Sequence, residues 1–197
     1  MTRVISMKYH VLSASLLFSL LFTTAAQAKT ASYKLDESHT SVVISWNHLG
    51  FSNPTASVHN VDGTVEFDPA TKTLSLVDIN IPVASIDTGV PALNKEFVQP
   101  DYFDAEKYPV ANFKSTSIKS NGDKYDVYGN LTIKSITRPV ILHATLNKAG
   151  FQAMEKKNAV GFNVTGMIKR SDFKIDKYVP YVSDNVTLTV SSEAYSD

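Results

Sequence analysis

The feature that most constrains the fold is the alternation of apolar and polar residues along most of the chain. In residues 128–146, YGNLTIKSITRPVILHATL, Leu131 and Ile133 alternate with polar neighbours, and after a break at Ser135–Pro139 the pattern resumes up to Leu146. Successive side chains of a strand point to opposite faces, so such a run predicts a strand with one apolar face. Similar runs occupy residues 42–48, 61–67, 74–83, 125–133, 140–146, 160–168 and 186–190.

Turn-forming residues separate these runs, as at Asp68-Pro69 and Asn121-Gly122-Asp123. Many strands with one apolar face each are hidden most simply by rolling the sheet closed. We therefore predict an all-β fold, an antiparallel barrel of about eight strands. The parity of residues 74–83 changes midway, which indicates a β-bulge near Val77–Asp78.

One segment, residues 88–109, departs from the alternation. Pro91 suits the first position of a helix, Leu93 and Phe97 lie four residues apart on one face, and Pro100 ends the turn. This predicts a short helix at about residues 91–99, followed by an aromatic loop with Tyr102, Phe103 and Tyr108.

The first 28 residues have the three parts of a secretory signal. Arg3 and Lys8 form a basic start, residues 11–22 are mostly apolar, and Ala26-Gln27-Ala28 fits the cleavage pattern. We predict a cleaved signal peptide at residues 1–28, with Met7 as an alternative start, and a single domain at residues 29–197. A retained membrane anchor is the alternative, but the apolar run is shorter than the ~20 residues that a span needs.

The composition excludes several function classes. The chain has no Cys, so disulfides, thiol chemistry and thiolate metal sites are not expected. Lys plus Arg and Asp plus Glu both number 19, without a basic block, which argues against nucleic acid as a partner. The spacings of His39, His48, His59 and His143 match no metal-ligand signature, and no G-x-S-x-G nucleophile motif occurs.

Alternation alone does not decide whether the barrel is filled or hollow. A barrel of ~8 strands can be packed with side chains or hold one small ligand. Small residues at the inward positions Gly63, Gly129, Ala144 and Gly166 leave room inside, although glycine in a strand also marks a bend or bulge. Both arrangements remain open on this evidence.

Five stretches together resemble the YceI-like family of lipid/polyisoprenoid-binding proteins. They appear in the order of the family and span about residues 33–194: Asp36–Val42 (DESHTSV), Val61–Phe67 (VDGTVEF), Pro100–Ser115 (PDYFD…YP…FKS), Gly129–Val140 (GNLTIK…TRPV) and Gly161–Phe173 (GF…RSDF). Ser135 and Lys174 depart from the pattern, since the family usually has Gly at the first position and often at the second. Both departures concern the geometry of turns.

The resemblance implies an extended lipocalin-like barrel with a helix near one end and a hydrophobic tunnel. It implies non-catalytic binding of a long isoprenoid or similar amphiphile in the periplasm, for transport, storage or sequestration, with no cofactor other than the bound lipid. A ubiquinone-type prenyl tail is one plausible cargo. Inward parity predicts the ligand-binding wall: Val42, Ile44, Trp46, Val65, Phe67, Ile81, Phe113, Val127, Leu131, Ile133, Leu142, Phe162, Val164 and Ile168, with Leu93, Phe97 and Phe103 gating one end.

Polar residues near the predicted mouths leave alternatives open. His39, His48 and Arg170 are candidates for binding a lipid head group, whereas Arg170 could instead form a salt-bridged turn with Asp172. An enzyme or electron-transfer accessory acting on a quinone or isoprenoid would need these three candidates to converge at one mouth. The aromatic loop could be a plug over the core or a lip for transient membrane contact. A structural protein without cargo is a third reading.

Overall fold

The computed structural model describes residues 30–196, which form one antiparallel sheet of eleven strands. The strands are β1 (Ala31–Leu35), β2 (Ser41–His48), β3 (Thr55–Val58), β4 (Asp62–Asp68), β5 (Thr73–Pro82), β6 (Ile86–Asp87), β7 (Val110–Asn121), β8 (Lys124–Ile133), β9 (Ile136–Gln152), β10 (Lys157–Lys169) and β11 (Val182–Ser196). None of the helices in this part of the chain is long and apolar enough to span a bilayer. The predicted signal segment 1–28 lies outside the described residues.

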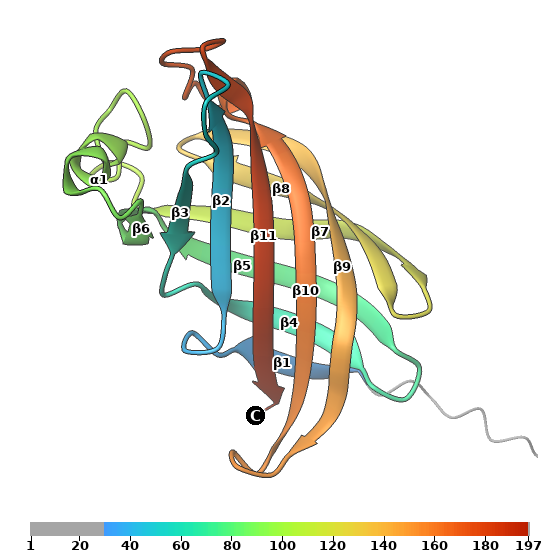
Figure 1. The fold of residues 1–197 in the computed structure, drawn as a ribbon. Coiled ribbons are helices and arrows are strands. Elements are labelled where there is room, and N and C mark those ends of the chain that lie inside the picture. Colours follow the sequence, from blue (N-terminus) through green and yellow to red (C-terminus); the bar gives the residue numbers. More distant parts are fainter. Residues whose placement is uncertain (1–29, 197) are drawn as a thin grey trace, which may run out of the picture.

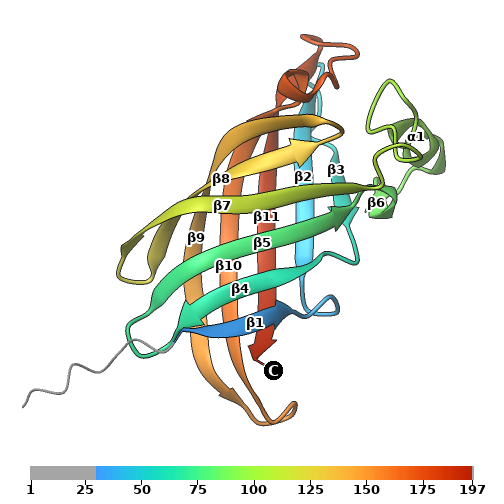
Figure 2. The same cartoon turned by 180° about the vertical axis from the view of Figure 1, so that it is seen from behind.

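The sheet closes into a barrel because β1 pairs with both β4 and β11. Eight strands form the ring in the order β1-β4-β5-β7-β8-β9-β10-β11, and β2, β3 and β6 extend the sheet from β11 (Figures 1 and 2). β11 is long enough to serve both parts, since its last residues pair with β1 and residues 182–191 pair with β2. The predicted all-β antiparallel barrel of about eight strands is confirmed.

β8 shows how the alternation builds the wall. Tyr125, Val127, Gly129, Leu131 and Ile133 are all buried, and the residues between them are exposed or half-buried. The turn to β9 is tighter than predicted, because Ile133 pairs directly with Ile136 and Pro139 already lies within the strand. The expected break at Ser135–Pro139 is therefore wrong in length.

The two departures from the family pattern lie in turns that nevertheless form. Lys134, beside Ser135, has a left-handed φ of 57°. Lys174, where the family often has Gly, has a φ of 55° and ends the short 3-10 helix η2 (Arg170–Phe173). A non-glycine residue in the left-handed conformation costs backbone energy, which contacts of the turn must offset. The ammonium of Lys134, for example, donates to the carbonyl of Lys174.

The β-bulge in β5 occurs two residues earlier than predicted. Leu74 faces Phe67 and Leu76 faces Glu66, so Ser75 is the extra residue, not Val77–Asp78. The bulge lets Leu74 and Val77 both face inward, which explains the change in parity.

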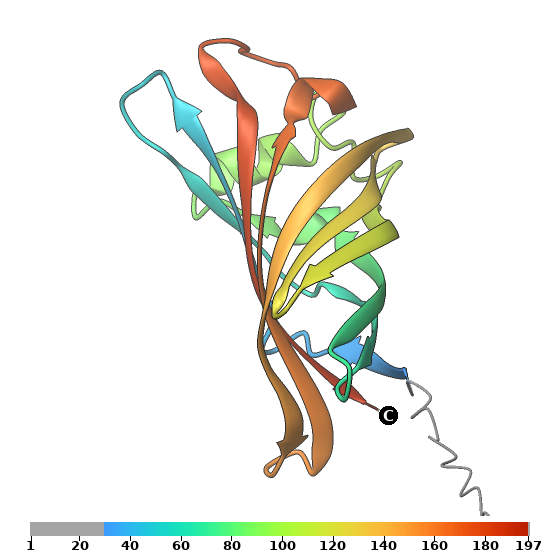
Figure 3. The ribbon, with the colours of Figure 1, turned by 90° about the vertical axis from the view of Figure 1, so that its right-hand side faces the viewer.

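The predicted helix is present as α1 (Pro91–Phe97), two residues shorter than expected at its end. Pro91 is at its first turn and Val98 caps it. A second 3-10 helix, η1 (Val83–Ser85), joins β5 to β6. α1 lies at one end of the barrel, beside β6 and opposite the end that holds the C-terminus (Figures 1 and 3). We call these the α1 end and the C-terminal end.

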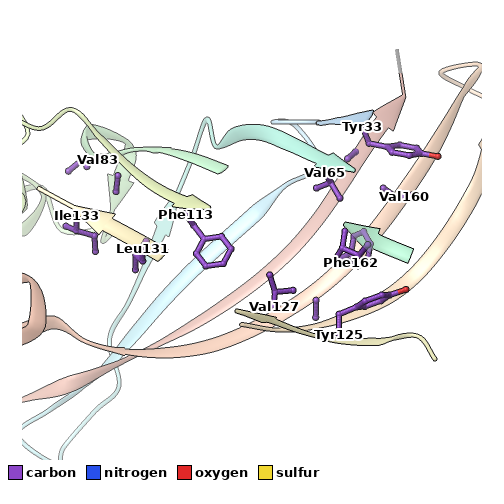
Figure 4. Close-up of a cluster of buried hydrophobic side chains, with 14 of the residues drawn as sticks. Tyr33, Val65, Val83, Phe113, Tyr125, Val127, Leu131, Ile133, Val160 and Phe162 are labelled. Atoms are coloured by element: carbon purple, nitrogen blue, oxygen red, sulfur yellow. The ribbon is translucent and has the colours of Figure 1, made fainter. Parts of the chain in front are cut away.

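An aromatic cluster packs at the C-terminal end of the barrel. Phe67 is fully buried and packs edge-on against Tyr33 and Phe162, with ring centroids 6.5 and 5.8 Å apart. Tyr125 packs on Phe162 in the same way, and its hydroxyl donates to the carbonyl of Lys72. Tyr33, Tyr125 and Phe162 gather on one side of Figure 4, and Leu131, Ile133 and Val83 lie toward the other. The aromatic cluster is a packed core.

The inward glycines do not leave the empty space that was expected of them. A Cβ on Gly129 would lie 2.4 Å from the ring of Phe113, and one on Gly166 would lie 2.6 Å from Leu142. Side chains of neighbouring strands therefore fill these positions. The glycines therefore do not explain why the barrel contains a cavity.

Candidate functional site: an apolar cavity

The barrel contains a partly open cavity of about 610 Å³, which extends from the α1 end to Leu35, Thr40 and Ser192 near the opposite end. Its wall consists of the inward-facing side chains of most strands together with α1, η1 and the segment that follows η2. Inward residues such as Val42, Ile44, Ile79 and Ile81 are only half-buried, in contrast to the aromatic cluster. They face inward without neighbours to cover them, because the cavity lies against them.

The structure places nearly all of the predicted wall residues on this cavity. These are Val42, Ile44, Trp46, Val65, Ile81, Leu93, Phe97, Phe103, Phe113, Val127, Leu131, Ile133, Leu142, Phe162, Val164 and Ile168. Phe67 was predicted with them and does not line the cavity, because it lies in the packed aromatic cluster. Parity identifies the face of a strand, not the position along the barrel axis, so it could not separate Phe67 from the rest.

Other wall residues were missed. Val77, Ile79, Leu188 and Val190 have the inward parity of runs that were recognised, so the pattern could have included them. Val83 ends the recognised run 74–83 with the same parity, so it too could have been included, whereas Ile175 lies outside the alternating runs and nothing in its local sequence indicates that it faces the interior.

An aromatic group closes the cavity near α1. The ring of Phe97 stacks on Tyr102 at 5.2 Å between centroids and also packs on Trp46 and Phe103. Tyr102 is buried, and burial raises the pKa of its hydroxyl. Tyr102 and Phe103 thus form a plug over the interior, not an exposed lip.

Polar groups on the wall gather at the α1 end: His48, Thr55, Thr88, Glu96, Arg170 and Lys177. Lys177 Nζ lies 2.8 Å from Glu96 Oε1, which ties the segment after η2 to α1. The hydrogen bond to Glu96 raises the pKa of Lys177, and each charge neutralises the other. At the other extreme of the cavity the polar wall residues are Thr40 and Ser192.

Arg170 cross-links the backbone of the segment between η2 and the start of β11. Its guanidinium donates hydrogen bonds to four carbonyl oxygens, those of Ile175, Lys177, Val182 and Ser183, at 2.7–2.8 Å. Burial lowers the pKa of Arg170, and the charge of Asp184 opposes that shift. The alternative of a salt bridge between Arg170 and Asp172 is wrong, because within residues 30–196 the guanidinium of Arg170 binds carbonyls instead. A carboxylate does stabilise this turn, since Asp184 accepts hydrogen bonds from the amide and the hydroxyl of Ser171.

The three head-group candidates do not meet. His48 and Arg170 line the cavity at the α1 end. His39 lies in the β1–β2 loop at the opposite end, is largely exposed and bonds to the carboxylate of Asp36. That hydrogen bond is the main reason why the pKa of His39 is raised. The enzyme or electron-transfer alternative required His39, His48 and Arg170 to converge at one mouth, and this convergence is therefore wrong. No cluster of three metal-ligating side chains occurs among residues 30–196.

Comparison with known proteins places the chain. A family model described as the YceI-like domain matches residues 33–194. The chain belongs to the YceI-like family. The YceI proteins of Salmonella arizonae and Salmonella heidelberg are each 37% identical to it over 179 residues, covering 90% of this chain and 93% of theirs.

Solved structures of YceI-like proteins have the same fold. BcnA of Burkholderia cenocepacia superimposes with a TM-score of 0.71 at 28% identity, covering 81% of this chain and 98% of that one. The Campylobacter jejuni YceI protein gives a TM-score of 0.70 at 29% identity, covering 77% and 90%. A polyisoprenoid binding domain from Saccharophagus degradans shares the fold, with a TM-score of 0.62 at 13% identity over 86% of this chain and all of the other.

Proposed function

We propose that this YceI-like protein binds the apolar chain of a long isoprenoid or similar amphiphilic lipid in the cavity, without performing chemistry on it. The observation that carries the proposal is the partly open cavity of about 610 Å³ with an almost wholly apolar wall. Pockets for small molecules have volumes of ~300–1,000 Å³ and are mostly apolar with few polar groups. The Saccharophagus degradans relative, named for polyisoprenoid binding, supports the same class of ligand.

The energetics of such binding need no special residue. Each buried CH₂ contributes ~0.8 kcal/mol. A few isoprene units therefore offset the ~4–15 kcal/mol that immobilising a ligand costs. Wide, dry apolar volume is sufficient, and this is what the half-buried wall residues provide.

The distribution of polar groups gives the bound lipid a direction. His48, Thr55 and Thr88 add to the polar groups at the α1 end, whereas the opposite extreme of the cavity has only the hydroxyls of Thr40 and Ser192 among the described residues. We place the polar head group at the α1 end and the tail toward Phe162. Glu96 pairs with Lys177, four guanidinium donors of Arg170 are taken by carbonyls, and the charge of Arg170 is opposed by Asp184 and Asp176, so both cations are already engaged at this end. A neutral polar head such as a quinone ring fits this end better than a phosphate.

The cellular setting is part of the proposal. The signal-like segment at residues 1–28 supports export to the periplasm. There a protein that shelters an oily chain from water would carry, store or sequester it, with transient contact at a membrane when cargo is exchanged.

The test is to express the full chain in bacteria, to isolate the protein from the periplasmic fraction (the released protein), and to identify the lipid that co-purifies with it. Native mass spectrometry followed by lipid extraction should show one amphiphile per protein, and the intact mass fixes the N-terminus. Protein that is free of lipid, and that takes up no added prenyl quinone, would contradict the proposal.

Leu131→Trp is the matching variant, because Leu131 lies on the wall and the larger ring would occupy the cavity. We expect lipid occupancy to fall about tenfold, while overpacking costs ~1–3 kcal/mol of stability. Ile141→Trp is the control: Ile141 is on the adjacent strand β9 but is 44% exposed on the outer face. Its occupancy should match that of the wild type.

A further inference from the structure

Two neighbouring loops at the α1 end expose large apolar side chains. Leu49 and Phe51, in the β2–β3 loop, are 49% and 91% exposed. Tyr178 and Tyr181, before β11, are 58% and 74% exposed. We call these four residues the apolar rim. Both loops extend beyond the barrel on the same side (Figures 1 and 3).

Hydrogen bonds hold the rim in place. The amide of Leu49 donates to the carbonyl of Tyr181 at 3.1 Å, which joins the two loops. The amide of Gly50, at a φ of 78°, donates to Asn47 Oδ1. On the other loop, Arg170 holds the carbonyls of Ile175, Lys177 and Val182. The loops are braced, so the apolar side chains are exposed in a fixed arrangement and docking them costs little ordering entropy.

The rim is continuous with the cavity. Tyr178 belongs to both, Pro54 lines the cavity from the β2–β3 loop, and His48 and Val182 line it from the strand ends that adjoin the two loops. An apolar chain leaving the cavity at this end would pass directly from the wall to the rim. This part of the inference rests on the proposed function.

The four rim side chains carry no charge, and the charge that adjoins them is paired: Lys177 Nζ lies 5.3 Å from the centroid of the Tyr178 ring and 2.8 Å from Glu96 Oε1. Residues 47–55 and 178–183, NHLGFSNPT and YVPYVS, contain no Asp, Glu, Lys or Arg. Burying a charged group in lipid is expensive, whereas aromatic rings with a polar edge favour the bilayer interface. We propose that the apolar rim docks onto the surface of a phospholipid bilayer and places the α1 end of the cavity against it. Since the rim side chains are uncharged and the adjoining Lys177 is paired with Glu96, docking depends on apolar insertion and needs no anionic lipid.

The far end of the barrel provides the contrast. Phe151 and Met154, in and after β9, are 64% and 87% exposed, so they are equally apolar and accessible. Charged residues adjoin them at Glu155, Lys156 and Lys157, as Lys177 adjoins the rim, but neither Phe151 nor Met154 lines the cavity. Apolar exposure alone thus occurs at both ends, and only the rim connects to the cavity.

The experiment is flotation of the released protein with phosphatidylcholine vesicles, comparing wild type with the double variant Phe51→Ser, Tyr181→Ser. Neither residue lines the cavity. We expect the vesicle-bound fraction to fall about tenfold or more in the double variant. Phe151→Ser, the same substitution at the far end, should stay within about twofold of wild type. Raising NaCl to about 0.5 M should not weaken binding.

The outcomes separate docking from cargo binding. We expect the double variant to lose flotation while the same amount of lipid co-purifies with it as with the wild type. This result supports docking as a distinct function of the rim. Three results would overturn the docking proposal: the wild type does not float, Phe151→Ser loses as much binding as the double variant, or the protein binds only anionic vesicles. None of these results bears on cargo binding, which the lipid extraction tests separately. Sedimentation velocity is run in parallel: a dimer that the double variant dissociates would assign the rim to self-association and would also overturn it.

Discussion

At the scale of single residues, environment decides what a side chain does. Arg170 and Arg138 are both in recognised motifs and both lie near strand ends. Arg138 is exposed, and its guanidinium makes one hydrogen bond, to the adjacent carbonyl of Thr137. Arg170 binds four carbonyls at once. The sequence identified both arginines but could not show this difference, because the carbonyl partners come from a segment with no pattern of its own.

Arg170→Met should therefore destabilise the fold. It removes the donors of four part-buried hydrogen bonds, and a buried carbonyl left without a donor costs ~1–3 kcal/mol. We expect a loss of at least about 3 kcal/mol in the free energy of unfolding, measured by urea denaturation. Lys cannot reproduce the planar fork of donors, so Arg170→Lys should not restore stability.

Arg138→Ala is the control and should change the free energy of unfolding by less than about 0.5 kcal/mol. If Arg170→Met were as stable as wild type and lost only its lipid, Arg170 would instead be a head-group ligand, the role first considered for it.

At the scale of elements, the sequence predicted most of the architecture. Alternation located the long strands, and Pro91 with the Leu93–Phe97 spacing located α1. Errors arose where pairing partners decide the outcome. Ser75 is bulged because of how Glu66 and Phe67 pair with β5, and the β8–β9 turn is short because Ile133 pairs with Ile136. Pairing across strands leaves no trace in the local pattern of one strand.

α1 is the element whose stability depends most on one side chain. It has only seven residues, too few to be stable alone, so tertiary contacts must hold it. Phe97 supplies them through Trp46, Tyr102 and Phe103. Phe97→Ala should cost about 3 kcal/mol locally, and amide hydrogen exchange in residues 91–105 should accelerate about a hundredfold.

Amides of β8 should keep their wild-type protection in Phe97→Ala, because that strand is held by β7 and β9. Lys95→Ala, an exposed change in the same helix, serves as the control and should leave exchange unaltered. Uniform acceleration throughout the barrel would show that α1 is part of the global folding unit and not a separately opening cover.

At the scale of the whole molecule, the barrel has a packed part, the aromatic cluster, and a hollow part along the cavity, which extends from the α1 end to Thr40 and Ser192. Inward parity predicted which residues face the interior, and nearly all of them do. It could not predict which part is hollow, because Phe67 and Ile44 have equivalent patterns in their strands. The difference arises from three-dimensional packing: Tyr33, Phe67, Tyr125 and Phe162 come together from four separate strands, β1, β4, β8 and β10.

This division predicts that stability and lipid binding can be separated by mutation. Phe67→Ala removes a fully buried ring from the packed part and should cost ~3–5 kcal/mol. Ile44→Ala enlarges a cavity that already lacks atoms on one side, so fewer contacts are lost and the cost should be about 1 kcal/mol. Urea unfolding of lipid-free protein measures both. Equal costs would mean that lipid-free protein packs its hollow part as tightly as the aromatic cluster, and the cavity would then need the lipid to hold it open.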